Sequence, residues 1–329
     1  MITELALTLL TSGFQDKGQY YPKADILMIA RSLDYAGTFT RRCEQLDEVI
    51  VLNKYRFRPV LTVRGTPLSG DFEAVGISDI RPATNRYKRE SLYMIALTRP
   101  DASGTLPGFS EWRYRPERED QLALADFQPC QLPEATYELV GNTEKQSVTH
   151  IYARAFQASQ NADYLNLIST SGKGELQFYT DSIEPILLRA ATGNDVLRAR
   201  VLWTSQAVGK VDRREELRTL VGKIDRETEN VDADLPPFPA AFSDEIDYLQ
   251  TMLHARTTAF RVAAINAFEV KPERRDLIIS MLGDSKKRVR YYAIKWLYKL
   301  HEEGAPQPKC GANETIENEA EVIAYWRGR

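Results

Sequence analysis

The chain of 329 residues has few of the side chains that most often build metal or redox sites. Its three cysteines and three histidines are far apart, and no C-x-x-C or H-E-x-x-H motif is present. A structural zinc site needs four nitrogen or sulfur ligands, usually in two close pairs. We therefore expect no metal and no other cofactor. Because the cysteines are odd in number and scattered, we expect a reducing, cytoplasmic location without a disulfide framework.

Long apolar runs are also missing. No stretch reaches the roughly 18 apolar residues that a membrane-spanning helix needs. The N-terminal segment MITELALTLLTSGF has no basic residue and carries Glu4 within its apolar stretch, so we expect neither a secretory signal nor a membrane partner. Charge of one sign is not in excess, because 43 Lys and Arg oppose 46 Asp and Glu, a net charge of −3. This composition is typical of a globular protein of one to three domains.

The first 180 residues combine helical and strand patterns. Apolar residues recur with a helical period over 2–10 and again over 26–33, after Pro22. Segments rich in β-formers follow at 48–52, 57–64, 91–97, 136–140, 148–156, 163–169 and 176–180. SGKG at 171–174 favours a hairpin turn between the last two. These patterns predict an α+β domain over 1–180 with a mostly antiparallel sheet, of no family that we recognise.

From residue 181 to residue 329 the pattern is helical. One segment, DRETENVDADLPPFPA at 225–240, interrupts it with five carboxylates and three prolines, and we interpret it as an inserted acidic loop or a linker. The fold class is therefore α+β overall. An N-terminal mixed domain over 1–180 precedes a C-terminal all-α domain over 181–329.

Two parts of the helical region repeat. MLHARTTAFRVAAINAF at 252–268 and MLGDSKKRVRYYAIKWL at 281–297 lie 29 residues apart and share five identities. In each segment apolar residues form one helical face, and a short helix precedes it. We expect antiparallel helix pairs over 182–301. The side chains expected between them are Phe260, Phe268, Trp296 and Leu297.

This repeat resembles the HEAT family of α-solenoids, which belong to the armadillo-type helical folds. The motif that carries the resemblance is a helix ending in Met-Leu, a polar turn with Asp284, then Val289-Arg290 and the small residue Ala293. The resemblance covers 182–301, is clear over 246–300, and includes a degenerate copy at Arg198. It implies a curved scaffold that binds another macromolecule, and it implies no chemistry. It also implies that the repeat arginines Arg261 and Arg290 form ion pairs within the chain.

The two clear repeats are basic. Between His254 and His301, eleven Lys and Arg residues oppose four Asp and Glu residues, a net charge of +7. The exposed face of the last repeat helix carries Lys287, Arg288, Tyr291, Lys295 and Lys299. Such a strip attracts an acidic protein or a phosphate backbone. It is equally compatible with a solvated helix surface, or with a face that pairs with the chain's own acidic segment.

A second candidate surface lies in the loop GFSEWRYRPERED at 108–120. It interleaves aromatic rings with guanidinium groups, the composition of interface hot spots and of base-stacking platforms. The candidate residues are Trp112, Arg113, Tyr114 and Arg115. The alternative is a long loop that Trp112 pins to the sheet.

Enzyme signatures are weak. The chain has no G-x-x-x-x-G-K-[ST] phosphate loop, no G-x-S-x-G elbow and no kinase motifs. A carboxylate cluster of Asp71, Glu73, Asp79 and Glu111 beside Arg81 or Arg86 is the remaining option for acid–base catalysis. We therefore assign no catalytic residue.

The hypothesis from the sequence is a non-catalytic interaction protein, such as an adaptor or an inhibitor of the immunity-protein type. It would bind a partner protein with an acidic surface through the helical repeats and the N-terminal domain. The alternatives are a nucleic-acid-binding protein, since certain DNA glycosylases with HEAT-like repeats use a concave basic surface, and an enzyme with an unrecognised site in 1–180.

Overall fold

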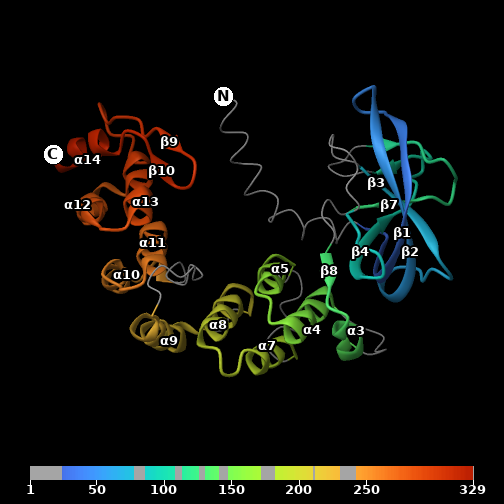
Figure 1. Ribbon diagram of the computed structural model, residues 1–329, viewed down its shortest axis with the longest axis horizontal. Coiled ribbons are helices and arrows are strands. Elements are labelled where there is room, and N and C mark those ends of the chain that lie inside the picture. Colours follow the sequence, from blue (N-terminus) through green and yellow to red (C-terminus); the bar gives the residue numbers. More distant parts are fainter. Residues whose placement is uncertain are drawn as a thin grey trace. The chain divides into compact units, whose positions relative to one another are not determined.

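The computed structural model describes residues 24–77, 86–107, 113–125, 130–140, 147–171, 182–209, 212–229 and 242–328 (Figure 1). The chain forms two compact units, Met1–Ala190 and Ala191–Arg329. The first unit holds a mostly antiparallel sheet followed by helices, and the second is largely helical. The predicted α+β class is therefore confirmed.

Five strands of the first unit close into a barrel. They are β1 (Ile26–Cys43), β2 (Glu48–Arg64), β3 (Phe72–Ile77), β4 (Leu92–Thr98) and β7 (Leu122–Leu124). Strand β1 pairs with β2 along one edge and with β4 along the other, β2 pairs with β3, and β7 lies between β3 and β4. Only the β3–β7 pair is parallel. This closed order resembles that of the OB-fold barrels.

The barrel interior follows from the alternation of side chains along the strands. On β2, Tyr55 and Phe57 point inward and are buried, whereas Arg56 and Arg58 are exposed. Tyr87 lies at the centre of the aromatic packing, with its ring 4.8 Å from that of Tyr55 and 5.0 Å from that of Phe57, both edge-on. The strands predicted at 48–52, 57–64 and 91–97 are therefore confirmed.

The helix predicted over 26–33 is wrong, because these residues belong to β1. Ile26–Ala30 form an unbroken apolar run that periodicity alone cannot divide between a buried helix and a buried strand. Pairing of this run with both β2 and β4 buries it on two sides and makes it a strand. The helix predicted over 2–10 lies outside the described residues.

Three predicted strands of the first unit are helices instead. The segments 136–140, 148–156 and 163–169 lie in α3 (Ala135–Val140), α4 (Val148–Ser159) and α5 (Asp163–Ser171). At the start of α4 the Ser147 side chain accepts a hydrogen bond from the backbone N–H of His150, which is a helix N-cap. A fourth helix, α7 (Glu184–Ala190), ends the unit. The strand predicted over 176–180 and most of the turn at 171–174 lie outside the described residues.

The second unit is helical, as predicted. Its elements are α8 (Asp195–Gly209), α9 (Arg214–Glu227), α10 (Ile246–Leu253), α11 (Thr258–Ala267), α12 (Arg275–Ser280), α13 (Lys287–Tyr298), the short strands β9 (Cys310–Gly311) and β10 (Thr315–Ile316), and α14 (Glu319–Arg327). The short 3₁₀ turns η6 (Pro272–Arg274) and η7 (Met281–Gly283) flank α12. Most of the acidic segment at 225–240 lies outside the described residues. Among the described helices, none is long and apolar enough to cross a membrane.

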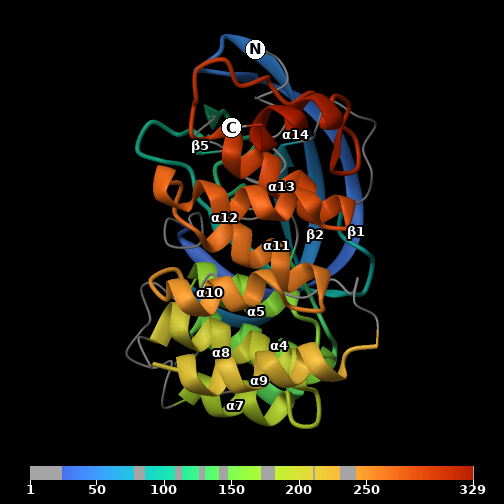
Figure 2. The same ribbon diagram turned by 90° about the vertical axis from the view of Figure 1, so that its left-hand side faces the viewer.

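The 29-residue repeat has a matching set of hydrogen bonds. Arg261 Nη1 on α11 donates to the carbonyl oxygens of Ala255 and Arg256, at 2.7 and 2.8 Å. Arg290 Nη1 on α13 donates to those of Asp284 and Ser285, which lie 29 residues later, at 2.9 and 3.3 Å. Helix α10 packs on α11, α12 on α13, and α11 on α13 (Figure 2). The helix pairs therefore repeat in contacts as well as in sequence.

Both repeat arginines also form the predicted ion pairs within the chain. Arg261 Nε lies 2.8 Å from Asp284 Oδ2, with both side chains 11% exposed. Arg290 Nε lies 2.7 Å from Glu319 Oε1 at the start of α14. Each arginine thus joins the turn before its own helix to an acidic residue further along the chain, and neither guanidinium is available to a ligand.

The aromatic face predicted between the helix pairs is buried. Phe260, Phe268, Trp296 and Leu297 are all at most 4% exposed. Trp296 Nε1 also donates a hydrogen bond to the Phe268 carbonyl oxygen at 3.0 Å. This bond and the ring together tie α13 to the end of α11.

Trp296→Ala should lower the free energy of unfolding by about 3–5 kcal/mol, because it removes a buried indole and leaves a cavity. Tyr298→Ala is the matched control on the same helix, since Tyr298 is 38% exposed, and it should cost less than about 1 kcal/mol. Urea denaturation followed by circular dichroism measures both. A loss below about 1 kcal/mol for Trp296→Ala would mean that the packed face is assigned wrongly.

Candidate functional site

Helix α13 presents one basic surface, which we call the α13 strip and define as Lys287, Arg288, Tyr291, Lys295 and Lys299. It lies away from the side on which Val289, Ala293, Trp296 and Leu297 are buried. Lys287 and Lys299 are exposed, and the other three side chains are half-buried. Lys295 Nζ lies 5.3 Å from the centre of the Tyr291 ring, which is a cation–π contact.

The strip is partly neutralised from within the chain. Arg288 Nε lies 3.0 Å from Glu314 Oε2, and the Tyr292 hydroxyl donates to Glu314 Oε1 at 2.9 Å. Burial and this hydrogen bond both raise the pKa of Tyr292. Over the described part of the chain, the three lysines of the strip have no carboxylate within ion-pair distance. The open positive charge of the strip is therefore carried by lysine.

Tyr298 belongs to the same surface and was missed in the sequence. It follows Tyr291 by seven residues and Lys295 by three, so it lies on the same helical face. It is 38% exposed, and its ring centre lies 6.2 Å from that of His301. The i, i+7 spacing of two tyrosines was the available signal.

The second candidate surface is more buried than its composition suggests. Trp112 lies outside the described residues. Tyr114 in β6 (Arg113–Tyr114) is 1% exposed and packs among Cys43, Leu52 and other residues of a core cluster. Burial raises the pKa of the Tyr114 hydroxyl, and the ring is not accessible to a partner. This residue is a core residue of the first unit.

The two arginines of this segment remain at the surface, but each has a carboxylate partner. Arg113 Nη1 donates to Asp101 at 2.6 Å, and Arg115 Nε donates to Glu44 at 2.9 Å. They lie in the first unit, whereas the α13 strip lies in the second. These two arginines are therefore less available to an anionic partner than the strip lysines are.

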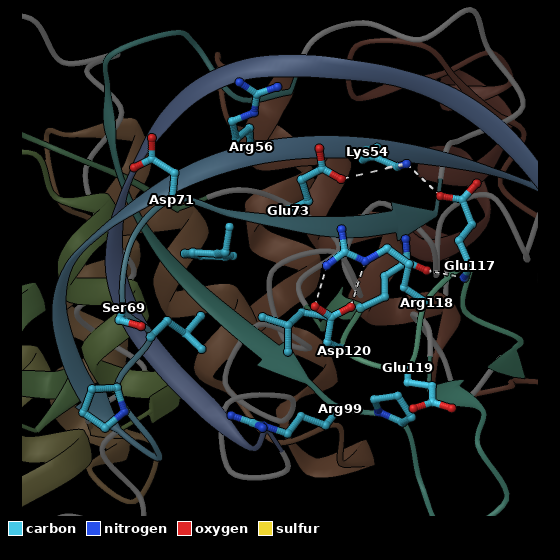
Figure 3. Close-up of a pocket in the computed structure, with 16 residues that line it drawn as sticks. Lys54, Arg56, Ser69, Asp71, Glu73, Arg99, Glu117, Arg118, Glu119 and Asp120 are labelled. Carbon is cyan, nitrogen blue, oxygen red and sulfur yellow. Dashed lines mark hydrogen bonds and ion pairs between the residues drawn. The ribbon is translucent and has the colours of Figure 1, made fainter.

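A cavity of about 700 Å³ opens on the outer face of the barrel (Figure 3). Side chains from β2, β3 and the segment 117–122 line it, together with Leu68 and Arg99. Figure 3 shows Lys54 between Glu73 and Glu117, at 3.9 and 2.7 Å from their carboxylates, and Arg118 facing Asp120. Most charges of the cavity wall are thus arranged in ion pairs.

Ion pairs lower the pKa values of three carboxylates in the cavity wall. Hydrogen bonds from Lys54, Arg58 and Arg118 hold the pKa values of Glu117, Asp71 and Asp120 below their ordinary values. A carboxylate that acts as a general acid needs a pKa raised toward the working pH, whereas the pKa values of these carboxylates are lowered. Asp79, Glu111 and Arg81 of the predicted cluster lie outside the described residues. Asp71, Glu117 and Asp120 therefore act as ion-pair partners. Within the described ranges, no group of three metal-binding side chains occurs.

Comparisons with known proteins found no matching family model, no matching curated protein and no matching solved structure. The helix pairs of the second unit are therefore characterised by their 29-residue spacing and by the contacts of Arg261 and Arg290 alone. The likeness of the barrel to the OB-fold rests on its strand order. A fold likeness carries no activity with it.

Glu314→Gln should lower the pKa of Tyr292, because it removes the negative charge of the carboxylate that accepts a hydrogen bond from the Tyr292 hydroxyl. The pKa should stay above its ordinary value, since burial is the larger cause of the shift. A pH titration of ¹³C-labelled tyrosines by NMR measures it. Glu303→Gln removes the same charge from an exposed residue eleven positions before Glu314 in the chain and should leave the Tyr292 titration unchanged. Equal curves for all three proteins would contradict the described contact.

Proposed function

We propose that this protein is a non-catalytic interaction protein whose α13 strip binds an acidic surface of a partner protein. The observation that carries the proposal is the difference between the arginines on α11 and α13 and the lysines of the α13 strip. Arg261, Arg288 and Arg290 are paired with carboxylates of the chain, whereas the strip lysines are not. Open ammonium groups beside the half-buried Tyr291 and the exposed Tyr298 have the composition of a protein-binding surface.

The scaffold of this surface is, in the same proposal, a short HEAT-like solenoid. Matching arginine contacts in consecutive helix pairs support it, since a solenoid is built from units that contact their neighbours in the same way. Adaptor and inhibitor proteins use such rigid helical surfaces to hold a partner. A cytoplasmic location belongs to the proposal as well. It is supported by Cys43, Cys130 and Cys310, which form no disulfide in the described part of the chain.

Nucleic-acid binding is the second candidate, because OB-fold barrels elsewhere bind oligonucleotides on their outer face. Three observations weaken it here. Lys54 and Arg118 on that face are ion-paired. The strip offers three open lysines, fewer than the six to ten phosphate contacts that give strong, salt-dependent duplex binding. The net charge of −3 also gives no long-range attraction for a polyanion.

Charge reversal at Lys287 and Lys295 tests the proposal. Proteins are captured from an extract of the native host on the wild type and on the K287E/K295E variant, after nuclease treatment. A protein that the variant loses is then purified, and its association with both forms is followed by stopped flow. Reversal should slow association about tenfold at low salt, because it removes electrostatic attraction, and should leave thermal unfolding nearly unchanged.

Lys271→Glu is the control, because Lys271 is a cation of the same unit outside α13 that already pairs with Glu269. It should be compared with Lys287→Glu alone and should leave association nearly unchanged. Duplex DNA is measured in parallel by fluorescence anisotropy. Micromolar or tighter DNA binding that falls steeply with salt and disappears in K287E/K295E would overturn the proposal in favour of nucleic-acid binding.

A further inference from the structure

Glu314 reaches α13 from a tight hairpin. Strands β9 and β10 pair through Cys310 with Ile316 and Gly311 with Thr315, and Glu314 lies in the turn between them. Its two carboxylate oxygens have different partners on α13. One accepts a hydrogen bond from Tyr292 at 2.9 Å, and the other lies 3.0 Å from Arg288 Nε. A tyrosine hydroxyl and a cation one helical turn apart therefore hold a single carboxylate.

The backbone of this turn is strained. Asn313 and Glu314 both have positive φ values, 54° and 53°, although neither is glycine. Left-handed backbone is unfavourable for residues with a side chain, Asn less than most, so two in succession must be stabilised by their surroundings. The Thr315 hydroxyl donates to the Ala312 carbonyl oxygen at 2.7 Å, and Glu314 contributes its two contacts on α13.

The same pair of side chains occurs a second time on α13. Lys287 and Tyr291 precede Arg288 and Tyr292 by one residue each, so the two cation–tyrosine pairs run side by side along the helix. The rings of Tyr291 and Tyr292 are 5.3 Å apart and meet edge to face. The first pair has no carboxylate on it among the described residues, whereas Glu314 occupies the second.

We propose that α13 is a carboxylate-binding surface with two adjacent places, of which Glu314 fills one and an acidic side chain of the partner protein fills the other. This inference rests on the proposed function and names the chemistry of the partner, a protein loop or helix that presents Asp or Glu. Glu314 then has two effects. Its contacts give the geometry with which a carboxylate binds a cation–tyrosine pair. Its charge neutralises Arg288 beside the open place and so weakens the binding of an acidic partner.

The contacts favour a carboxylate over a phosphate group. In the filled place, one oxygen of Glu314 contacts the Tyr292 hydroxyl and the other contacts Arg288. A carboxylate has two oxygens, so these two contacts use both of them. Phosphate groups are bound best by paired guanidinium forks or by several cations at once. The one arginine of the strip is already neutralised, and the open place has a lysine and a tyrosine.

A peptide of ten glutamates labelled with fluorescein is the probe, and its binding is measured by fluorescence anisotropy at low salt. Glu314→Gln should bind it about two- to fivefold more tightly than the wild type, which is the range set by one exposed ion pair. Glu303→Gln changes the net charge equally and should bind like the wild type. Tyr291→Phe should bind more weakly, because it removes the hydroxyl donor of the open place and retains the ring.

The outcomes separate the inference from the proposed function. If K287E/K295E loses the peptide but Glu314→Gln and Glu303→Gln bind it equally, Glu314 is not an internal occupant and only this inference is wrong. If K287E/K295E binds the peptide as well as the wild type does, the strip is not an acid-binding surface and the proposed function fails too. If the wild type binds inorganic tripolyphosphate, measured by isothermal titration calorimetry, but does not bind the peptide, the carboxylate assignment is wrong.

Discussion

The second unit depends on how the guanidinium group of Arg261 is satisfied. A nearly buried charge is unfavourable unless its donors all have partners, and removal of one partner costs more than the pair contributes. Arg261 meets two carbonyl oxygens and the Asp284 carboxylate, and so joins the turn before α11 to the turn before α13. Arg290 repeats the arrangement and connects the turn before α13 to α14. These contacts hold α13 rigidly, and a binding surface on a rigid element loses little entropy when a partner binds.

This use of arginine explains which charges remain for a partner. The planar guanidinium forms several directed hydrogen bonds at once, whereas the lysine ammonium is strongly hydrated and favours the surface. In the second unit, the repeat arginines Arg261 and Arg290 therefore form contacts within the chain, and the open charge of the α13 strip is carried by lysines. Arg288, the one arginine of the strip, likewise forms an ion pair within the chain, with Glu314. The resulting surface attracts carboxylates without the density of open cations that a duplex requires.

Local sequence patterns predicted the second unit better than the first. The 29-residue repeat contains the apolar face of Trp296, so its packing could be inferred from one segment, and the resemblance to HEAT repeats implied the ion pairs of the two arginines. In the first unit, short apolar segments such as 148–156 fit a strand or a helix equally well, and only the Ser147 cap favoured the helix. The burial of Tyr114 depends on pairing with Cys43, 71 residues earlier, and the place of Glu314 on Arg288 depends on a turn without a helical period. Contacts of this kind have no local signature.

Site-specific photo-crosslinking from position 291 in living cells identifies the molecule that the α13 strip contacts. A benzoylphenylalanine at position 291 keeps an aromatic ring within the strip, and the same residue at the exposed position 137 in α3 serves as the reference. If the strip binds an acidic protein, position 291 should form a covalent adduct of discrete mass with one protein. Position 137 should not form this adduct, and the K287E/K295E background should lose it. The crosslinked peptide of that protein should contain Asp or Glu. An adduct with nucleic acid at position 291, or an adduct that persists after charge reversal, would contradict the proposed binding.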